Sequence, residues 1–306
     1  MSIAGLKYFL TKPGGWFFFL SSRGLLNWMD DETYLRREFK YSVGHELDLD
    51  NPKTFNEKLQ WLKLHDRRPL YTSLVDKFEV KRYVAEKIGP EYVIPVVGGP
   101  WDTADEIDFD ALPKQFVLKC THDSGGLAIC RDKASFDREG AKKKLAKAMR
   151  RNYFWSSREW PYKDVRPRVL AEEYIEDGSG ELSLTDYKVM CFGGEPRLIQ
   201  VHKGRTSSHT QDFYDTDWNA LSITQELPSS GQTTPRPAQL EEMLQLSQTL
   251  AAGLPQVRVD WYLADRRLFF GELTFFDGGG FAEFEPDSYN YLVGEWIRLP
   301  AEEANA

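Results

Sequence analysis

Apolar residues in the first third of the chain recur at helical intervals. Within residues 31–84 they include Phe55, Leu59, Leu62, Phe78 and Tyr83. Side chains three and four positions apart share one face of a helix, so this spacing is typical of amphipathic helices. Pro52 and Pro69 interrupt the pattern, because the residue before a proline disfavours the helical conformation. The pattern predicts a helical N-terminal part.

From about residue 92 the pattern changes to short apolar runs separated by turn residues, which is typical of strands. The predicted strands cover residues 93–97, 115–120, 127–131, 168–175, 186–192, 196–202, 257–263 and 267–274. Turns are predicted at 121–126, 177–180, 193–194 and 265–266, and helices at 138–152 and 240–254. Helices and strands in this order predict an α+β fold.

Composition narrows the class of protein. The 306 residues are 41% hydrophobic, 28% charged and 14% aromatic, which fits a folded globular chain apart from the tail at 301–306. A net charge of −8 argues against nucleic acid as a partner, because nucleic-acid binders neutralise phosphates with a basic surface. The three cysteines lack metal-ligand spacing and fit a reduced, cytoplasmic setting.

An apolar block near the N-terminus, residues 15–20, is far shorter than the roughly 20 residues that span a bilayer. Lys7, Lys12 and Arg23 flank it, as in segments that lie on a membrane surface. Two interpretations stay open: peripheral contact with the inner membrane through this aromatic N-terminus, and ordinary core packing or partner docking.

Two late strands carry the most informative polar residues. Arg258 and Asp260 alternate along one strand, and Glu272 and Thr274 along the next, so each pair projects to one face. If the strands are neighbours, a cation, two carboxylates and a hydroxyl converge. Such oxygen ligands suit Mg²⁺ bound together with substrate phosphates. An arginine–carboxylate cluster on a solvated sheet face is the alternative, and these strands alone leave both open.

The loop after Lys119 is a candidate phosphate site. Its glycines let backbone amides approach a phosphate, and its polar side chains add donors and a positive charge. The candidate contacts are Lys119, His122, Ser124, Gly125 and Gly126. The loop has neither the Walker nor the dinucleotide-binding pattern, so a plain turn is the alternative.

Glu172, Glu173 and Tyr174 end an apolar strand. Such a strand end can present backbone groups to an adenine edge and a carboxylate to ribose hydroxyls. It can equally be an exposed strand end.

The order of these motifs resembles the ATP-grasp superfamily. The matching positions are Lys77, Lys119 with its glycine loop, Glu172 to Tyr174, Asp186-Tyr187-Lys188, Arg258-x-Asp260 and Gly271-Glu272-x-Thr274. The run from Asn51 to Trp61 and the run Gly271-Glu-Leu-Thr-Phe bring the chain closest to the TupA-like branch, which is typified by teichuronopeptide synthesis. The resemblance extends from about Tyr34 to Leu299, and the combination is far more specific than any one motif.

The resemblance implies two α+β lobes that grip ATP, preceded by a helical extension. The expected boundaries are 1–90 for the extension, 91–175 for the N-lobe and 176–300 for the C-lobe. By resemblance, Lys77 and Lys119 contact the α and β phosphates under the loop 122–126. Glu172, Glu173 and Tyr174 line the adenine pocket, Asp186 holds the ribose, and Lys188 completes the nucleotide-binding set.

The catalytic residues also follow from the resemblance. Asp260 and Glu272 bridge Mg²⁺ to the β and γ phosphates, and Arg258 steadies the transferring phosphoryl group. Thr274 stands where the superfamily usually has Asn, and its hydroxyl is still a neutral oxygen ligand. Lys203, Arg205 and His209 form a polar loop for the γ phosphate or an anionic saccharide, with a solvated loop as the alternative.

The implied reaction is carboxylate activation by ATP. The substrate carboxylate becomes an acyl phosphate, and an amine then displaces phosphate to form an amide. The branch implies polysaccharide biosynthesis, as in a capsule or O-antigen, with a uronic acid or other sugar carboxylate and an amino acid or amine as substrates.

Three other functions stay open. A kinase would pass the γ phosphate to a glycan hydroxyl with Asp277 or Glu283 as base. A sugar-nucleotide glycosyltransferase would use the same carboxylate-bound metal. A non-catalytic nucleotide-binding partner of a membrane assembly would use the aromatic N-terminus.

Overall fold

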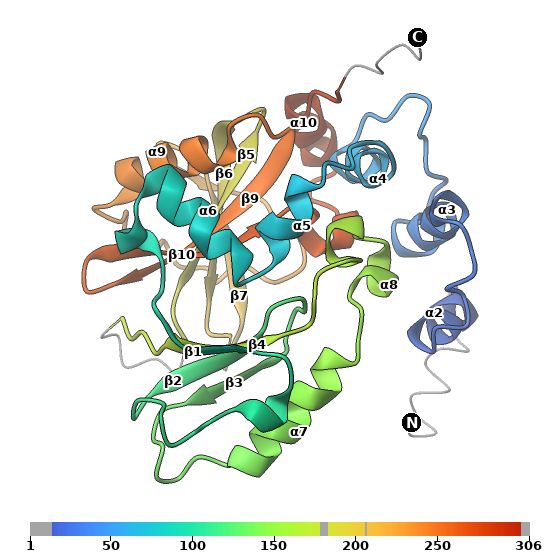
Figure 1. Ribbon diagram of the computed structural model, residues 1–306. Helices are drawn as coiled ribbons and strands as arrows, with labels where there is room; N and C mark the ends of the chain where they lie inside the picture. The colour runs from blue at the N-terminus through green and yellow to red at the C-terminus, as the bar shows by residue number, and fades with distance from the viewer. Residues whose placement is uncertain (1–13, 178–182, 206, 301–306) are drawn as a thin grey trace.

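A computed structural model describes residues 14–177, 183–205 and 207–300, and it has the predicted α+β class (Figure 1). Lys7, Lys12 and the tail at 301–306 lie outside the described residues, as does most of the turn predicted at 177–180.

Residues 14–88 are largely helical, as predicted. The helices are α2 (Gly15–Ser22), α3 (Asp31–Ser42), α4 (Phe55–His65), α5 (Leu70–Val75) and α6 (Glu79–Ile88). Asp30 caps α3, and Thr54 with Glu57 forms a capping box at α4, which fixes where each begins. Among the described residues, no helix combines the length and the apolar character needed to cross a membrane.

A four-stranded antiparallel sheet forms the smaller lobe, at the bottom of Figure 1. Its strands, in the order β1-β4-β2-β3, are β1 (Val96–Trp101), β2 (Phe116–Cys120), β3 (Leu127–Cys130) and β4 (Val169–Glu173). Helix α7 (Arg138–Met149) covers it, and Leu145 joins Phe116 and Leu118 in a separate small core.

The first strand was predicted at 93–97, but β1 begins only at Val96. Pro95 has no amide hydrogen to donate to a ladder, and Val93 forms an isolated bridge with Phe270 of the other lobe. The apolar run therefore links the lobes before the strand begins.

A six-stranded antiparallel sheet forms the larger lobe, in the order β10-β9-β5-β6-β7-β8. The strands are β5 (Asp186–Phe192), β6 (Glu195–Lys203), β7 (Thr210–Tyr214), β8 (Ala220–Leu221), β9 (Gln256–Ala264) and β10 (Arg267–Thr274). The remaining helices are α8 (Phe154–Ser157), α9 (Leu240–Ala251) and α10 (Ser288–Trp296), with 3₁₀ turns η1 (Pro90–Tyr92), η2 (Ala104–Glu106), η3 (Trp160–Tyr162) and η4 (Asp277–Gly280).

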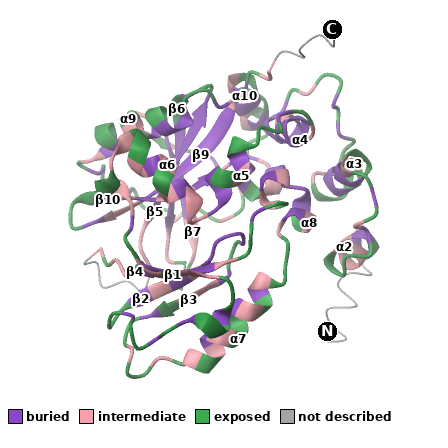
Figure 2. Ribbon diagram, viewed as in Figure 1, coloured by how far each residue is buried: buried purple, intermediate pink, exposed green. Residues whose placement is uncertain are grey.

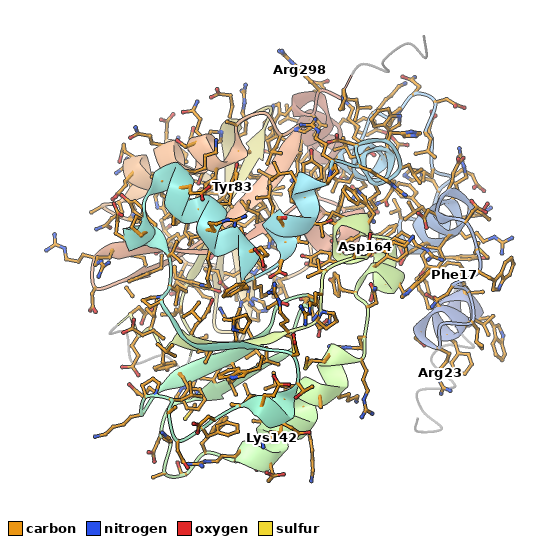
Figure 3. The ribbon with its side chains drawn as sticks, in the orientation of Figure 1. Phe17, Arg23, Tyr83, Lys142, Asp164 and Arg298 are labelled. Atoms are coloured by element: carbon orange, nitrogen blue, oxygen red, sulfur yellow. The ribbon has the colours of Figure 1, made fainter. Side chains whose placement is uncertain are left out.

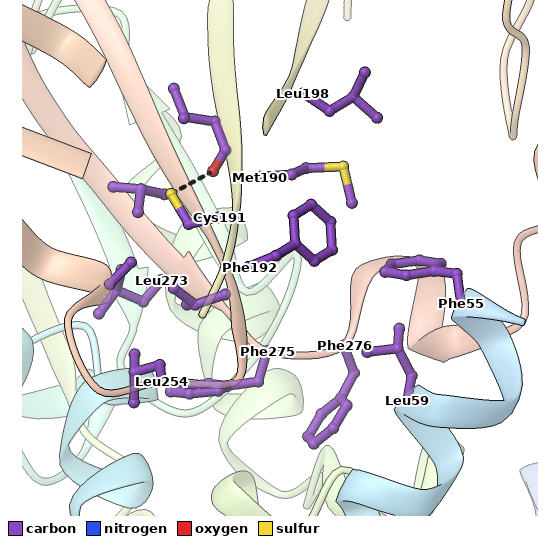
Figure 4. Close-up of a cluster of buried hydrophobic side chains, with 14 of the residues drawn as sticks. Phe55, Leu59, Met190, Cys191, Phe192, Leu198, Leu254, Leu273, Phe275 and Phe276 are labelled. Atoms are coloured by element: carbon purple, nitrogen blue, oxygen red, sulfur yellow. Dashed lines mark hydrogen bonds between the residues drawn. The ribbon is translucent and has the colours of Figure 1, made fainter. Parts of the chain in front are cut away.

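One continuous core joins this sheet to the N-terminal helices. Strand β9, next to the edge strand β10, is buried along most of its length (Figure 2). Figure 4 shows Phe55 and Leu59 of α4 beside Phe276, in the cluster that contains Phe192 of β5. The N-terminal helices thus pack as part of the larger lobe, and the smaller lobe keeps its own core.

Candidate active site

Two cavities lie between the lobes and share Arg205. The main cavity, about 730 Å³, is lined mostly by the large sheet and the helices beside it, including Lys77, Lys188, Arg258 and Glu272. The slot, about 300 Å³, lies between β2–β4 and the large sheet and has Ile94, Val117 and Ile129 among its walls. A polar cavity therefore continues into a more apolar slot.

The two late strands bring their polar residues together. In the antiparallel register of β9 and β10, Asp260 lies opposite Glu272 and Arg258 lies opposite Thr274. On its other side, Asp260 lies opposite Lys188 of β5. The sheet thus gathers two carboxylates, two cations and a hydroxyl on neighbouring strands.

Asp260 lies beneath the main cavity and is 2% exposed. Both of its oxygens accept from Arg258, at 2.7 Å from Nε and 2.9 Å from Nη2, and Lys188 forms a second ion pair. Burial opposes ionisation, but the charges of Arg258 and Lys188 outweigh it and hold the pKa of Asp260 below its ordinary value. The two cations therefore favour the ionised form of Asp260.

Glu272 lies at the cavity wall and is more exposed. Its oxygens lie 3.4 Å from Lys77 Nζ and 3.8 Å from Arg258 Nη2, and the Thr274 hydroxyl accepts from the same Nη2 at 3.1 Å. Burial favours the neutral acid, yet the nearby cations, led by Lys77, lower the pKa of Glu272. The alternative interpretation, an arginine–carboxylate cluster, describes the contacts, but the cluster is largely buried and not on a solvated face.

The donor set fits a magnesium ion that shares its ligands with phosphate. No group of three or more His, Cys, Asp or Glu residues that could enclose a metal exists in the described ranges. Mg²⁺ commonly takes one or two carboxylates and completes its shell with phosphate oxygens and water. Glu272 is the more accessible of the two carboxylates, whereas both oxygens of Asp260 are bound by cations.

Asp277 also belongs to this cluster. It forms an ion pair with Arg258 and accepts from Gln200 Nε2 at 2.7 Å. Arg258 therefore joins three carboxylates, and sequence reasoning had placed Asp277 only as a kinase base.

The predicted adenine-pocket residues all line the slot. Glu172 is 4% exposed and bridges two lysines, Lys119 and Lys81, the latter at 2.6 Å. Burial opposes its ionisation, but the two ammonium groups lower its pKa. Glu172 thus holds Lys119 at the slot wall. At the junction of the cavities, Asp186 pairs with Arg205 at 2.5 Å.

The loop after β2 is closed by its own backbone. Cys120 N donates to Gly126 O at 2.7 Å, and Gly125 has a φ of +90°, which an L side chain rarely adopts. Ser124 lines the main cavity, whereas His122 is buried against the carbonyl of Arg151 at 3.1 Å. His122, Gly125 and Gly126 line neither the main cavity nor the slot.

In the loop after β6, too, some of the predicted residues line a cavity and one does not. Arg205 and His209 line the main cavity, and Lys203 lines neither cavity. His209 lies 3.2 Å from His202, whose pKa is lowered to about 2 by burial and by the charges of Lys188 and Arg258. His202 is therefore a neutral imidazole.

Several cavity residues were missed by sequence reasoning. They are Glu38, Tyr153, Glu159, Tyr162, His202 and Glu226. Glu38 carried a usable signal, since it shares the buried face of α3 with Tyr34, Leu35 and Phe39. A charged residue on an apolar helix face is a candidate for function.

Comparison with solved structures finds enzymes of low sequence identity. D-Alanine–D-alanine ligase from Helicobacter pylori is 14% identical, with 82% of this chain and 70% of that one covered and a TM-score of 0.41. The corresponding ligase from Bacillus anthracis, complexed with ATP, is 16% identical, with 66% and 55% covered and a TM-score of 0.36. N5-carboxyaminoimidazole synthase from Aspergillus clavatus, with ADP and an aminoimidazole ribonucleotide, is 13% identical, with 75% and 53% covered and a TM-score of 0.42.

The chain spans about half the length of the Bacillus anthracis ligase. No curated protein matches it. The family described as TupA-like ATP-grasp matches residues 57–298, which is most of the chain. This match confirms the predicted resemblance and the ATP-grasp fold: the chain belongs to the TupA-like ATP-grasp family.

Proposed function

We propose that this ATP-grasp enzyme is an ATP- and Mg²⁺-dependent ligase that joins a carboxylate to an amine. The observation that carries the proposal is the main cavity, where Lys77, Lys188, Arg205 and Arg258 surround the carboxylate of Glu272 beside a more apolar slot. Positioned cations and a metal-ligating carboxylate are what phosphoryl transfer to a carboxylate requires.

ATP lies across the two cavities in this proposal. The adenine occupies the slot beside Tyr174, and the ribose lies near Asp186 at the junction. The phosphates extend past Lys119 into the main cavity, where Lys77 and Ser124 reach them. Glu272 and Asp260, with Thr274 adjacent, would hold Mg²⁺, which would supply charge neutralisation for the phosphates.

The chain's own residues orient the substrate carboxylate. Arg205 and His209 bind it at the cationic end of the main cavity, and Arg258 faces the γ phosphate. A carboxylate oxygen attacks the γ phosphorus, the bond to ADP breaks, and the product is an acyl phosphate. An amine nitrogen then attacks the acyl carbon, and inorganic phosphate leaves with the electron pair of the broken C–O bond.

The substrate class rests on the family branch. We place the enzyme in polysaccharide biosynthesis, with a uronic acid or similar sugar carboxylate and an amino acid or amine as substrates. A cavity of about 730 Å³ has room for a monosaccharide beside the γ phosphate.

The test is ADP release by the purified chain with Mg²⁺-ATP and pairs of uronic acids and amino acids, with hydroxylamine as a trap. A ligase releases ADP only with a competent carboxylate and yields a hydroxamate. ADP release without hydroxamate would indicate a kinase instead, although Asp277 is already bound by Arg258 and Gln200. Selective binding of UDP-sugars over ATP would overturn the proposal in favour of a glycosyltransferase, and binding without turnover would indicate a non-catalytic partner.

We also propose that the protein works in the cytoplasm, at the inner membrane surface. Trp16, Leu25 and Trp28 are 58%, 57% and 79% exposed around α2. Figure 3 places Arg23 at the outer edge of the same region, away from the sheets. Aromatic residues beside a cation suit a lipid headgroup region. Sedimentation with anionic vesicles should fall in Trp28→Ala, and equal sedimentation of both proteins would contradict the contact.

A further inference from the structure

The main cavity adjoins a second cavity beneath the N-terminal helices. A side cavity of about 560 Å³ is lined by Phe18 and Ser21 from α2, Tyr34 from α3 and Trp155 from α8, among others. It shares Glu38, Ser124 and Tyr153 with the main cavity. The residues from α2 and α3 precede position 57, where the family match begins. The N-terminal extension therefore builds one wall of the active site.

Glu38 lies where the two cavities meet. Its side chain is 6% exposed and lines both of them. Its Oε2 is buried and has no hydrogen-bond partner among the residues that the structure describes. An ionised carboxylate in such a place is costly unless a cation or donor meets it. The unmet oxygen indicates a cationic ligand.

Glu159, 3% exposed, is the second carboxylate at this end of the main cavity. One of its oxygens accepts from the Ser157 hydroxyl at 3.0 Å. The nearby cation Lys63 serves other acceptors, since its ammonium donates to the carbonyls of Ser157 and Gly279 at 2.7 Å each. Lys63 thus lowers the electrostatic cost of the two carboxylates without occupying their cavity face.

On the sheet side of the main cavity, Lys188 and Arg258 lie with Glu272 and Asp277, and Arg258 pairs with both of these carboxylates. Glu38 and Glu159 line the same cavity from α3 and from the residue before η3. An anionic substrate is drawn to the cations, and a cationic one to Glu38 and Glu159. A ligase needs both, because its carboxylate is an anion and its amine arrives as an ammonium ion.

We propose that Glu38 and Glu159 bind the ammonium group of the amine substrate, which enters through the side cavity beneath α2 and α3. This inference rests on the proposed ligase function. The ammonium gives one proton to a carboxylate of this pair, which frees the nitrogen lone pair. The nitrogen attacks the acyl carbon, the C–N bond forms, phosphate leaves, and the second proton passes from nitrogen to the departing phosphate.

The acidity of the pair supports this role. Burial raises the pKa of Glu38 to about 8 and that of Glu159 to about 7, and the charge of Lys63 opposes both shifts. The other groups near Glu38 include Arg158, which lowers its pKa, Glu159, which raises it, and Tyr34 of the same helix. The positive charge of a bound ammonium favours the ionised form of both groups, and carboxylates this weakly acidic take a proton back from the nitrogen when it attacks.

The experiment compares the wild type with Glu38→Gln and Glu159→Gln, using the carboxylate and amine found in the ADP-release screen. Glutamine keeps the shape but cannot hold an ammonium by charge. We expect the KM for the amine to rise about tenfold or more in each variant, with the KM for the carboxylate within about twofold. Hydroxylamine is largely uncharged at neutral pH, so it does not depend on a carboxylate for binding. The substitutions should therefore lower the rate of amide formation at least about tenfold more than the rate of hydroxamate formation.

Glu32→Gln is the matched control, since Glu32 lies on the same helix and is exposed. A wild type that makes no hydroxamate removes the ligase proposal and this inference with it. A wild type that makes hydroxamate, with an unchanged amine KM in both variants, overturns this inference alone. Equal loss of hydroxamate and amide in folded variants, checked by thermal melting, also overturns it, because the residues would then serve the site as a whole.

Discussion

At the scale of single residues, Asp260 and Glu272 face each other across two strands but have different surroundings. Asp260 is enclosed by Arg258 and Lys188, whereas Glu272 opens to the cavity. Removing one partner of a buried ion pair leaves the other charge uncompensated, which typically costs about 3–5 kcal/mol. An exposed pair contributes about 1 kcal/mol or less.

We therefore expect Glu272→Gln to abolish ADP release while lowering the free energy of unfolding by only about 1 kcal/mol. Asp260→Asn should abolish ADP release and also destabilise the fold by about 3 kcal/mol. Denaturant titration and a coupled ADP assay measure the two effects, with exposed Glu195→Gln as the control. Full turnover in both site variants would remove the metal assignment.

Lys119 and Lys81 both bind Glu172, so they can be compared directly. Lys81 also donates to the Ile94 carbonyl at 2.9 Å, which makes it part of the fold. Lys119→Ala should raise the Kd for ATP about tenfold with little loss of stability, because Lys81 still neutralises Glu172. Lys81→Ala should show the larger loss of stability, by melting, and the smaller change in ATP affinity. The opposite pattern would make Lys119 the structural residue.

The raised pKa of Glu38 makes the stability of the folded chain depend on pH. Its pKa is about 8 in the folded state against an ordinary 4.5, so between these values the folded chain binds the proton and the unfolded chain does not. The proton bound to Glu38 in the folded state contributes its full stabilisation below about pH 4.5, and this contribution is lost as the pH rises towards 8. We expect the stability advantage of Glu38→Gln over the wild type to grow across this range in pH-dependent melting. A constant difference would contradict the raised pKa.

Strand alternation alone placed Arg258, Asp260, Glu272 and Thr274 on shared faces, and the register of β9 and β10 agrees with it. It could not place Lys188 against Asp260, because β5 lies far away in the sequence and no local pattern encodes a non-local pairing. Nor could it show that His122 turns inward, since a loop motif does not fix the direction of each side chain.

At the scale of elements, the segments with a clear apolar pattern were predicted, including the short strands β2 and β3, and a few others were missed. The hairpin of β9 and β10 and helix α9 have strong periodicity. Strands β7 and β8 and helix α10 were missed, because β8 has two residues and α10 begins after Pro286 without a capping side chain. Tertiary packing, more than local propensity, defines such elements.

The buried side chain of Arg158 helps to attach helices α2 and α3 to the site. Arg158 stacks on Tyr34 at 4.3 Å and on Trp155 at 4.6 Å, and it donates to the carbonyls of Leu26 and Met29. Its φ of 56° lies in the left-handed region, which Asn tolerates best among the non-glycine residues. Arg158→Asn therefore removes these contacts and keeps the backbone.

We expect Arg158→Asn to increase hydrogen exchange in residues 15–42 by about tenfold or more, with little change in β5 and β9. The loss of stacking on two rings and of two hydrogen bonds is the cause. Arg150→Asn, at an exposed position, is the control. Equal exchange in both variants would show that the apolar contacts of Phe17 and Leu26 hold these helices without the arginine.

At the scale of the whole molecule, two separate cores are joined largely by polar contacts. Arg168 of the smaller lobe reaches Asp76 and Glu79 at 3.0 Å each, and Lys77 N donates to Thr121 O at 3.0 Å. The smaller core is limited to one sheet face and the helices beside it, whereas the larger continues through the six-stranded sheet and the N-terminal helices. Less buried apolar area means less local stability for the smaller lobe.

Hydrogen exchange should therefore be faster in β1–β4 than in β5, β6 and β9 of the free protein. A nucleotide that contacts both lobes stabilises the closed arrangement by an amount that grows with its concentration over its Kd. With Mg²⁺ and a non-hydrolysable ATP analogue, we expect exchange in β2 and β4 to slow more than exchange in β6, because Lys119 and Glu172 lie at the slot and β6 is already protected by the larger core. Mg²⁺ alone is the control. Equal slowing in both sheets, or none in β2, would contradict a nucleotide held between the lobes.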